Sequence, residues 1–143
     1  MAELPALQIQ RIGPTDTHLV ERAVMLFDRA VDADATQRFL ASDTHHLLVA
    51  SIGGEPVGFV TGVETIHPDK GAEMMIYELG VAPMHRRRRV GTNLVDALRR
   101  LARKRGCYGM WVPIDAGDTI AIATYRAGGA GAPEHAAVMT WEL

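Results

Sequence analysis

The segment from Tyr77 to Gly106 constrains the fold of this chain most, because it passes from a strand pattern through a basic turn into a helix pattern. The apolar run at 74–81 is typical of a buried strand, and apolar residues spaced three or four apart from Val90 onward are typical of one helix face. Gly106 stands where helices commonly end. The segment therefore predicts a strand, a turn and a long helix in succession.

Four consecutive arginines occupy the predicted turn, directly before the helix. The first N–H groups of a helix have no partner inside it, and the helix dipole places partial positive charge at the same end. Arginine adds full charge and a fork of donors that matches phosphate oxygens. We therefore expect a pyrophosphate-bearing cofactor at the turn, held by Arg86, Arg87, Arg88, Arg89, Val90, Gly91 and Thr92.

The charge of the chain is divided unevenly. Residues 86–105 carry nine of the 15 Lys and Arg residues and one of the 17 acids, so the rest has six basic residues against 16 acidic ones. A basic patch on an acidic chain suggests one anionic and one cationic partner, although an ordinary solvated surface is the alternative interpretation. The basic segment has no interleaved aromatic residues, which argues against a nucleic-acid partner.

Length and composition indicate one domain over residues 1–143 with a hydrophobic core, since 48% of the residues are hydrophobic and 22% are charged. The sequence has no apolar run of about 20 residues and no signal-peptide pattern, so we expect no membrane span. Cys107 is the only cysteine, which excludes an intrachain disulfide and fits a reducing cytoplasm. The histidines are scattered apart from His45 and His46, so we expect no metal site.

Hydrophobic periodicity and turn signals divide the chain into short elements. Strands are expected at 7–12, 47–50, 56–63, 74–81, 107–114 and 138–143, with a tight hairpin turn at Gly53 and Gly54. Helices are expected at 19–30, from an Asp34 cap to about 41, from 90 to Gly106, and at 119–127 behind an Asp118 cap. Central hairpins and two terminal βαβ crossings predict an α/β fold, a mixed sheet with helices on both faces.

Two motifs in this order resemble signatures of the GNAT acyltransferase superfamily. Residues 81–91, VAPMHRRRRVG, are similar to its acetyl-CoA-binding motif, Q/R-x-x-G-x-G/A between a strand and a helix. Residues 115–125, DAGDTIAIATY, resemble its second signature, a helix with the pattern Asp/Asn-x-x-A-x-x-x-Tyr. The sequence around 76–81, 115–118 and 138–139 is similar to that of aminoglycoside 3-N-acetyltransferases.

The resemblance implies a GNAT-like fold in which acetyl-CoA lies between two splayed strands, 74–81 and 107–114. Backbone groups of Leu79, Gly80 and Val81 would bind its pantetheine, and N–H groups at 86–92 would bind its pyrophosphate. Transfer to an amine would be direct, through a tetrahedral intermediate. Such a reaction needs a base for the protonated amine and an acid for the departing thiolate.

Glu78, on the strand beside the expected cofactor, is the candidate base and a candidate acceptor contact; an outward carboxylate is the alternative. Tyr125 aligns with the family's general acid near the cofactor sulfur, or is simply a core residue. Asp115, at the end of a strand, either orients or deprotonates the amine or belongs to a plain turn. Acids that could line the acceptor cleft are Glu64, Glu73, Glu78, Asp115, Asp118, Glu134 and Glu142.

Arg89 stands where the family motif has glycine. Shifting the motif by two positions would make Gly91 the first glycine but would put Asn93 at the second small position, so we interpret Arg89 as a substitution. Its side chain either points outward and attracts the phosphates or crowds them. We expect cofactor binding to be retained, because the helix N-terminus and three other arginines remain. Cys107 has no visible histidine partner, which argues against a nucleophilic role.

The sequence therefore predicts an N-acetyltransferase that uses acetyl-CoA and acts on a polycationic small molecule, an aminoglycoside at its 3-amino group, as antibiotic-resistance enzymes do. The alternatives are a GNAT for another amine, such as a polyamine or a protein lysine, and a degenerate CoA-binding sensor. We also expect a homodimer, with the apolar edge strand at 138–143 as a plausible contact.

Overall fold

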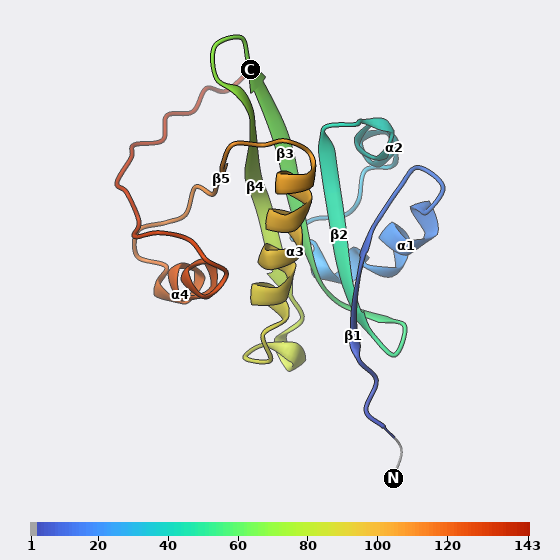
Figure 1. Cartoon of the computed structure of the whole chain (residues 1–143). Helices are drawn as coiled ribbons and strands as arrows, with labels where there is room; N and C mark the ends of the chain where they lie inside the picture. Colours follow the sequence, from blue (N-terminus) through green and yellow to red (C-terminus); the bar gives the residue numbers. More distant parts are fainter. Residues whose placement is uncertain (1–2) are drawn as a thin grey trace.

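A computed structural model describes residues 3–143 and contains a five-stranded mixed sheet of order β1-β2-β3-β4-β5 (Figure 1). Strands β1 to β4 are antiparallel neighbours, and β5 runs parallel to β4. The strands are β1 Leu7–Arg11, β2 His45–Ile52, β3 Glu55–His67, β4 Gly71–Val81 and β5 Met110–Trp111. The helices are α1 Thr17–Arg22, α2 Ala33–Ala41, α3 Val90–Lys104 and α4 Thr119–Ala127, with 3-10 turns η1 Val24–Leu26 and η2 Pro83–His85. The predicted α/β class is confirmed.

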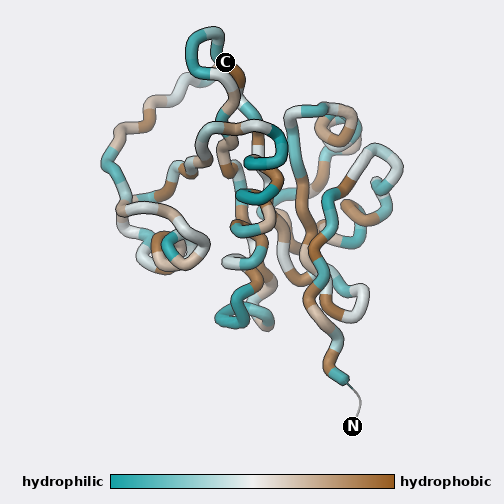
Figure 2. The backbone as a smooth tube through the Cα atoms, in the orientation of Figure 1, coloured by the Kyte–Doolittle hydropathy of each residue, from teal (hydrophilic) through white to brown (hydrophobic). Residues whose placement is uncertain are grey.

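Helices cover both faces of the sheet, because successive residues on a strand point to opposite sides. Leu48 and Val60 pack with α3 and α4, whereas their neighbours Leu47 and Phe59 pack with α1 and α2. In Figure 1, α3 crosses one face of β3 and β4. The hydrophobic residues in Figure 2 are concentrated along the strands and on the inner side of α3. Each face of the sheet therefore carries its own core.

A bulge interrupts the pairing of β4 with β3 at Tyr77. Ile76 lies opposite Gly62 and Glu78 lies opposite Thr61, so Tyr77 has no partner on β3. The Glu78 N–H donates to the Thr61 Oγ1 at 3.1 Å, which satisfies a backbone group at the irregularity. One extra residue in a strand turns all later side chains to the opposite face of the sheet.

Strand β5 pairs with β4 at two positions only, Met74 with Met110 and Met75 with Trp111. Pro113 follows two residues later and has no N–H to continue the ladder. The prediction of a strand over 107–114 is therefore wrong for most of its length, because the strand covers only Met110 and Trp111. The short β5 agrees with the expected splay of the two strands. At residues 76–81, the edge of β4 that faces away from β3 has no strand partner within residues 3–143.

Two predicted helices differ from the structure. Asp32 rather than Asp34 caps α2, since its Oδ1 accepts from the Ala35 N–H at 2.8 Å. The helix expected at 19–30 is divided into α1 and η1 and ends before Phe27, which is extended. The extended backbone brings the Phe27 ring to 4.5 Å from the Phe59 ring, measured between centroids. Tertiary packing on the sheet thus outweighs the helical pattern.

The predicted terminal strand at 138–143 is also wrong for the described chain. Residues 130–143 follow α4 as an extended segment outside the sheet (Figure 1). Val138, Met139, Trp141 and Leu143 are exposed. A strand pattern needs a partner with free N–H and C=O groups, and none is beside this segment within residues 3–143. The second βαβ crossing is consequently absent.

The predicted turn and cap chemistry is otherwise confirmed. Gly53 and Gly54 both have positive φ, at 57° and 82°, as a two-residue hairpin turn requires. Asp118 caps α4 by accepting from the Ala121 N–H at 2.9 Å. Among the helices of residues 3–143, none combines the length and apolar character needed to cross a bilayer.

Candidate active site

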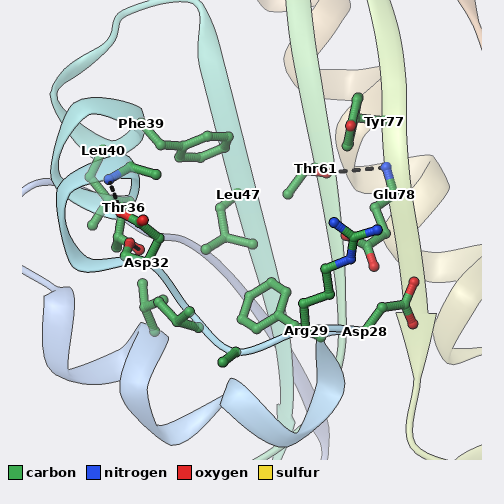
Figure 3. A pocket seen from close by; sticks show the side chains of 15 residues that line it. Asp28, Arg29, Asp32, Thr36, Phe39, Leu40, Leu47, Thr61, Tyr77 and Glu78 are labelled. Atoms are coloured by element: carbon green, nitrogen blue, oxygen red, sulfur yellow. Dashed lines mark hydrogen bonds between the residues drawn. The ribbon is translucent and has the colours of Figure 1, made fainter. Parts of the chain in front are cut away.

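A cavity of about 640 Å³ lies between β3 and β4 on one side and the η1–α2 segment on the other (Figure 3). Its apolar wall includes Phe27, Phe39 and Leu47. Its charged side chains are Asp28, Arg29, Asp32 and Glu78. Three acids against one base in an apolar cavity favour a cationic ligand.

The bulge at Tyr77 determines that Glu78 faces this cavity. Before the bulge, Met74 and Ile76 pack against α3. After it, Leu79 and Val81 pack on that same face. In a regular strand the alternation would have put Glu78 beside Ile76 in the α3 core. With the bulge, Glu78 lies on the opposite side and lines the cavity.

Burial raises the pKa of the Glu78 carboxyl, and Asp28 raises it further through its charge and a hydrogen bond. Both effects disfavour the ionised form, since a second negative charge and a less polar environment each penalise a carboxylate. A carboxyl with a raised pKa in a cavity is a common property of catalytic acids and bases. Glu78 therefore has the environment of a proton-transfer group.

The turn with the four arginines connects the end of β4 to the start of α3. The first residues of α3 start a ladder in which the Asn93 N–H donates to the Arg89 carbonyl at 2.9 Å. Within residues 3–143, no acceptor takes the N–H groups of residues 90–92. Arg86 Nε donates to the Val81 carbonyl at 3.4 Å and so ties the turn to the end of β4. These donors fit a pyrophosphate, and the open strand edge fits an extended amide chain.

Two arginines in the turn have left-handed backbone, Arg87 with φ 60° and Arg89 with φ 63°. This conformation explains the family preference for glycine at position 89, because a Cβ raises the energy of left-handed backbone. All four arginine side chains, from 86 to 89, are exposed. The outward orientation expected as one alternative for Arg89 agrees with this exposure.

Gly91 lets α3 approach α4 closely, since a Cβ at this position would lie 3.2 Å from Thr124 Cγ2. Tyr125, the next residue of α4, is 8% exposed and belongs to the α3-side core. Burial raises the pKa of its hydroxyl, with a smaller contribution from Asp118. A protonated hydroxyl is therefore held next to the helix whose N-terminus carries the basic turn.

The other predicted site acids lie elsewhere. Asp115 and Asp118 are exposed beyond β5, and Asp115 Oδ1 accepts from the Gly117 N–H at 2.9 Å. Glu142 and Glu134 are exposed in the segment after α4. None of these four residues lines the cavity that contains Glu78. Of the acids predicted to line the acceptor cleft, only Glu78 lines this cavity, where it is joined by Asp28 and Asp32.

The polar cavity residues that were not predicted include Asp28, Asp32 and Thr61. Asp28 lies inside a stretch that reads as helix, so no local signal assigns it to a loop facing the sheet. Thr61 lies inside a regular strand pattern, and only the register of β3 against β4 reveals its bond to the Glu78 N–H.

Glu64 and Cys107 belong to a separate buried network. Arg105 donates to Glu64 through Nη2 at 2.8 Å, and His46 Nε2 bonds to the same carboxylate at 3.1 Å. Cys107 Sγ donates to Glu64 Oε1 at 3.8 Å. Burial, followed by Glu64, raises the pKa of the thiol. A protonated thiol is a poor nucleophile, so this network is structural rather than catalytic. Within residues 3–143, no group of three His, Cys, Asp or Glu side chains could hold a metal ion.

Several solved structures with the same fold are acetyltransferases. The aminoglycoside acetyltransferase meta-AAC0020, from an uncultured soil metagenomic sample and in complex with sisomicin, matches 96% of this chain and 96% of its own at 21% identity and a TM-score of 0.87. AAC(6')-Iy, in complex with the bisubstrate analogue CoA-S-monomethyl-acetylneamine, matches 96% of this chain and 99% of its own at 21% identity and a TM-score of 0.81.

A third similar structure is that of an enzyme whose name gives a protein as its substrate. Ribosomal-protein-alanine N-acetyltransferase from Brucella melitensis biovar Abortus 2308 matches 96% of this chain and 100% of its own at 21% identity and a TM-score of 0.71. These identities show the fold, and the aminoglycoside enzymes among them include a 6' type, so the 3-N subfamily expected from sequence is not specifically supported. A search of curated proteins gives no match.

The family model for the "Acetyltransferase (GNAT) family" matches residues 16–129, which include α1, the cavity, the basic turn and α4. The splayed strand, the donors at the start of α3 and the acid in the cavity agree with that match. The chain belongs to the GNAT family of acetyltransferases, enzymes that use acetyl-CoA as the acetyl donor.

Proposed function

We propose that this enzyme acetylates an amine of a polycationic small molecule, an aminoglycoside at its 3-amino group, and thereby confers antibiotic resistance. The observation that carries this proposal is the cavity beside the open edge of β4, which contains Asp28, Asp32 and Glu78 in an otherwise largely apolar wall. Several carboxylates attract a substrate with several ammonium groups more strongly than a substrate with one. Meta-AAC0020, which has this fold, is in complex with the aminoglycoside sisomicin.

Acetyl-CoA would bind along the open part of β4 and across the basic turn. Backbone groups of Leu79, Gly80 and Val81 would pair with its pantetheine, as a neighbouring strand would. The N–H groups at 90–92 and the arginines at 86–89 would hold its pyrophosphate. The acetyl group would then lie at the gap between β4 and β5, within reach of an amine held in the cavity.

Glu78 would remove a proton from the bound ammonium group, which gives the amine the lone pair that it needs to react. Its raised pKa brings it closer to neutral pH and makes it a better base than an ordinary carboxylate. Tyr125 would give a proton to the departing thiolate, because burial keeps its hydroxyl protonated at neutral pH. A large acceptor that extends beyond the cavity would contact three further acids through its outer amines, namely Asp115, Asp118 and Glu142.

A thiol-release assay tests the acceptor class. With acetyl-CoA as donor, we expect release with gentamicin-type aminoglycosides and little or none with spermidine or lysine peptides. Mass spectrometry and NMR of the product then identify the acetylated nitrogen, and a 6'-acetylated product would replace the 3-amino assignment. Release only with lysine peptides would contradict the small-molecule acceptor, and no release with any amine would favour a CoA-binding sensor.

Replacement of Glu78 by Gln tests the base. The amide keeps the size of the side chain but cannot accept the proton, so we expect kcat to fall by roughly 10²–10⁴. The thermal shift produced by acetyl-CoA should stay at the wild-type value, since Glu78 lies in the acceptor cavity. A loss of less than tenfold in kcat would remove Glu78 from this role.

A protein acceptor is the second candidate. The fold matches a ribosomal-protein-alanine N-acetyltransferase, which acts on an alanine of a ribosomal protein by its name. An alanine residue has an amine to acetylate only where it is the first residue of a polypeptide. Peptides with a free N-terminal alanine therefore belong in the same assay as the lysine peptides.

We further propose that the enzyme is a homodimer and works in the cytoplasm. The exposed segment at 138–143 has four large apolar side chains and a strand pattern without a partner among the described residues, 3–143. Unpaired apolar strands commonly pair with another chain. The lone cysteine fits a reducing compartment.

A further inference from the structure

Tyr77 is an exposed aromatic residue within β4, and it lines the same cavity as Glu78 (Figure 3). Its exposed fraction is 73%, whereas the residue before it, Ile76, is 2% exposed. Single exposed aromatic residues are ordinary on protein surfaces, so exposure alone assigns no role. Tyr108, for example, is 59% exposed and does not line the cavity. Tyr77 differs from it by its place in the cavity wall.

The bulge in β4 explains why two consecutive side chains line one cavity. Side chains alternate along a regular strand, so residues 77 and 78 would face opposite sides of the sheet. Ile76 and Leu79 both pack on the α3 face, and the two residues between them both lie on the opposite face. Tyr77 is the extra residue of β4, without a partner on β3. The same irregularity therefore places an aromatic ring next to the proposed base.

The cavity thus combines carboxylates with an aromatic ring. Asp28, Asp32 and Glu78 supply three acids, against one base from Arg29 among the described residues that line it. An aromatic ring attracts cations to its face and packs well against flat apolar surfaces. An amino sugar has ammonium groups that suit the acids, and its ring has a face of C–H bonds that suits the aromatic side chain. The two kinds of side chain therefore match the two chemical characters of an amino sugar.

The size of the cavity favours a ring over a linear amine. Pockets for drug-sized ligands measure about 300–1,000 Å³, and this cavity measures about 640 Å³. Asp28 and Asp32 belong to the connection between η1 and α2, opposite the wall formed by β3 and β4. A polyamine or a lysine side chain is a single row of methylene groups, whereas a sugar ring is broad enough to contact both walls.

We propose that Tyr77 is an acceptor-binding residue, whose ring packs on the C–H face of an amino sugar while an ammonium group of the same sugar reaches Glu78. Tyr77 contributes affinity for the ring of the acceptor and takes no part in proton transfer. This inference rests on the proposed function, because it assigns the cavity to the acceptor, and it names the part of the acceptor that the cavity binds.

The first experiment measures binding of gentamicin to the full chain by calorimetry. Tyr77→Leu removes the ring and keeps an apolar side chain, so we expect Kd to rise roughly threefold to thirtyfold. Tyr77→Phe keeps the ring and should bind gentamicin as the wild type does. Tyr108→Leu is the matched control, since it removes an exposed tyrosine outside the cavity and should leave Kd unchanged. Because Tyr77 is exposed, Tyr77→Leu should unfold at the same urea concentration as the wild type.

The second experiment tests stacking directly. Protons that lie over the face of an aromatic ring resonate upfield, so NMR of saturated complexes should show an upfield shift of sugar C–H protons with the wild type and Tyr77→Phe. The shift should be absent with Tyr77→Leu. In the thiol-release assay, Tyr77→Leu should raise KM for gentamicin and keep kcat within about threefold of the wild type, because Glu78 still accepts the proton.

The outcomes separate this inference from the proposed function. Gentamicin binding with equal Kd in the wild type and Tyr77→Leu would overturn the role of Tyr77 and leave the aminoglycoside acceptor in place. Equally weak binding by Tyr77→Phe and Tyr77→Leu would overturn stacking, because the hydroxyl and not the ring would then make the contact. Absence of gentamicin binding to the wild type would overturn both the acceptor and the role of Tyr77.

Discussion

Single residues in this enzyme adopt unfavourable states where ligands are expected. Arg89 has φ 63°, which costs an L-residue roughly 1–2 kcal/mol relative to right-handed backbone. Glu78 is a carboxyl group whose charged form is disfavoured by its surroundings. Both are held by the structure around them, the first by the start of α3 and the second by the bulge in β4.

Replacement of Arg89 by Gly separates backbone strain from charge. Glycine adopts this φ without the Cβ cost but loses more chain entropy on folding, so the free energy of unfolding should change by less than about 1 kcal/mol. Acetyl-CoA should raise the melting temperature of the wild type and of Arg89→Gly, with a weaker salt dependence in the variant because one cation is lost.

Arg89→Ala is the matched control, since it removes the charge and keeps the Cβ. It should reproduce the weaker salt dependence of binding and be less stable than Arg89→Gly. A wild type without any thermal shift from acetyl-CoA, together with a shift in Arg89→Gly, would mean that Arg89 blocks the cofactor site.

At the scale of elements, the candidate active site depends on an irregularity in β4 and on the short length of β5. The bulge at Tyr77 moves Glu78 from the α3 face to the cavity. The two-residue pairing of β5 leaves the end of β4 open for an extended ligand. A regular antiparallel pairing of β3 with β4 would have buried the carboxylate, and a longer parallel β5 would have closed the gap.

Thr61→Val tests the bond that supports the bulge. Valine has nearly the same shape but cannot accept the Glu78 N–H, so the free energy of unfolding should fall by about 1–2 kcal/mol. The activity should fall with it, because Glu78 loses its fixed position. Urea denaturation and the thiol-release assay measure the two effects.

Thr61→Ser keeps the hydroxyl acceptor and serves as the control for Thr61→Val. It should retain most of the activity despite the loss of a methyl group. Equal activity in the valine and serine variants would show that the hydroxyl does not position Glu78.

At the scale of the whole molecule, a buried polar network joins β2, β3 and the end of α3. Arg105 lowers the pKa of the Glu64 carboxyl through their hydrogen bonds, and burial lowers the pKa of His46. His46 and Glu64 are 1% and 8% exposed. The network therefore connects three elements that lie far apart in the sequence.

The network predicts acid sensitivity. Below the ordinary histidine pKa of about 6.5, the unfolded chain binds a proton at His46 before the folded chain does, so the free energy of unfolding falls as pH falls. Below the ordinary Glu pKa, protonation of Glu64 in the unfolded chain adds to this loss. Urea denaturation should thus give a lower stability at pH 5 than at pH 7, and His46→Gln should reduce this slope. An equal slope in His46→Gln would contradict the assignment.

In the proposed dimer, the exposed segment at 138–143 pairs with a second copy of the chain. Removal of residues 138–143 should convert a dimer into a monomer, as measured by light scattering. Trp141→Lys, which puts a charge on the apolar side of the segment, should weaken the dimer as well. A full-length chain that is monomeric at micromolar concentration would contradict the homodimer.

Features that depend on neighbouring residues can be predicted from the sequence alone. Local spacing predicted β4, the basic turn and α3, and cap chemistry predicted Asp118 at the start of α4. The two motifs identified the family, and Glu78 was a candidate because it stands beside one of them.

Features that depend on strand register and on contacts between distant segments become visible only in the folded structure. The bulge at Tyr77 exists only where β3 meets β4, and no periodicity reports it. Asp28 lines the same cavity as Glu78 because Phe27 leaves the helical path to pack on Phe59. The segment at 138–143 carries a strand pattern but no strand, since hydrogen-bonding partners come from the arrangement of the sheet and not from the sequence of one segment.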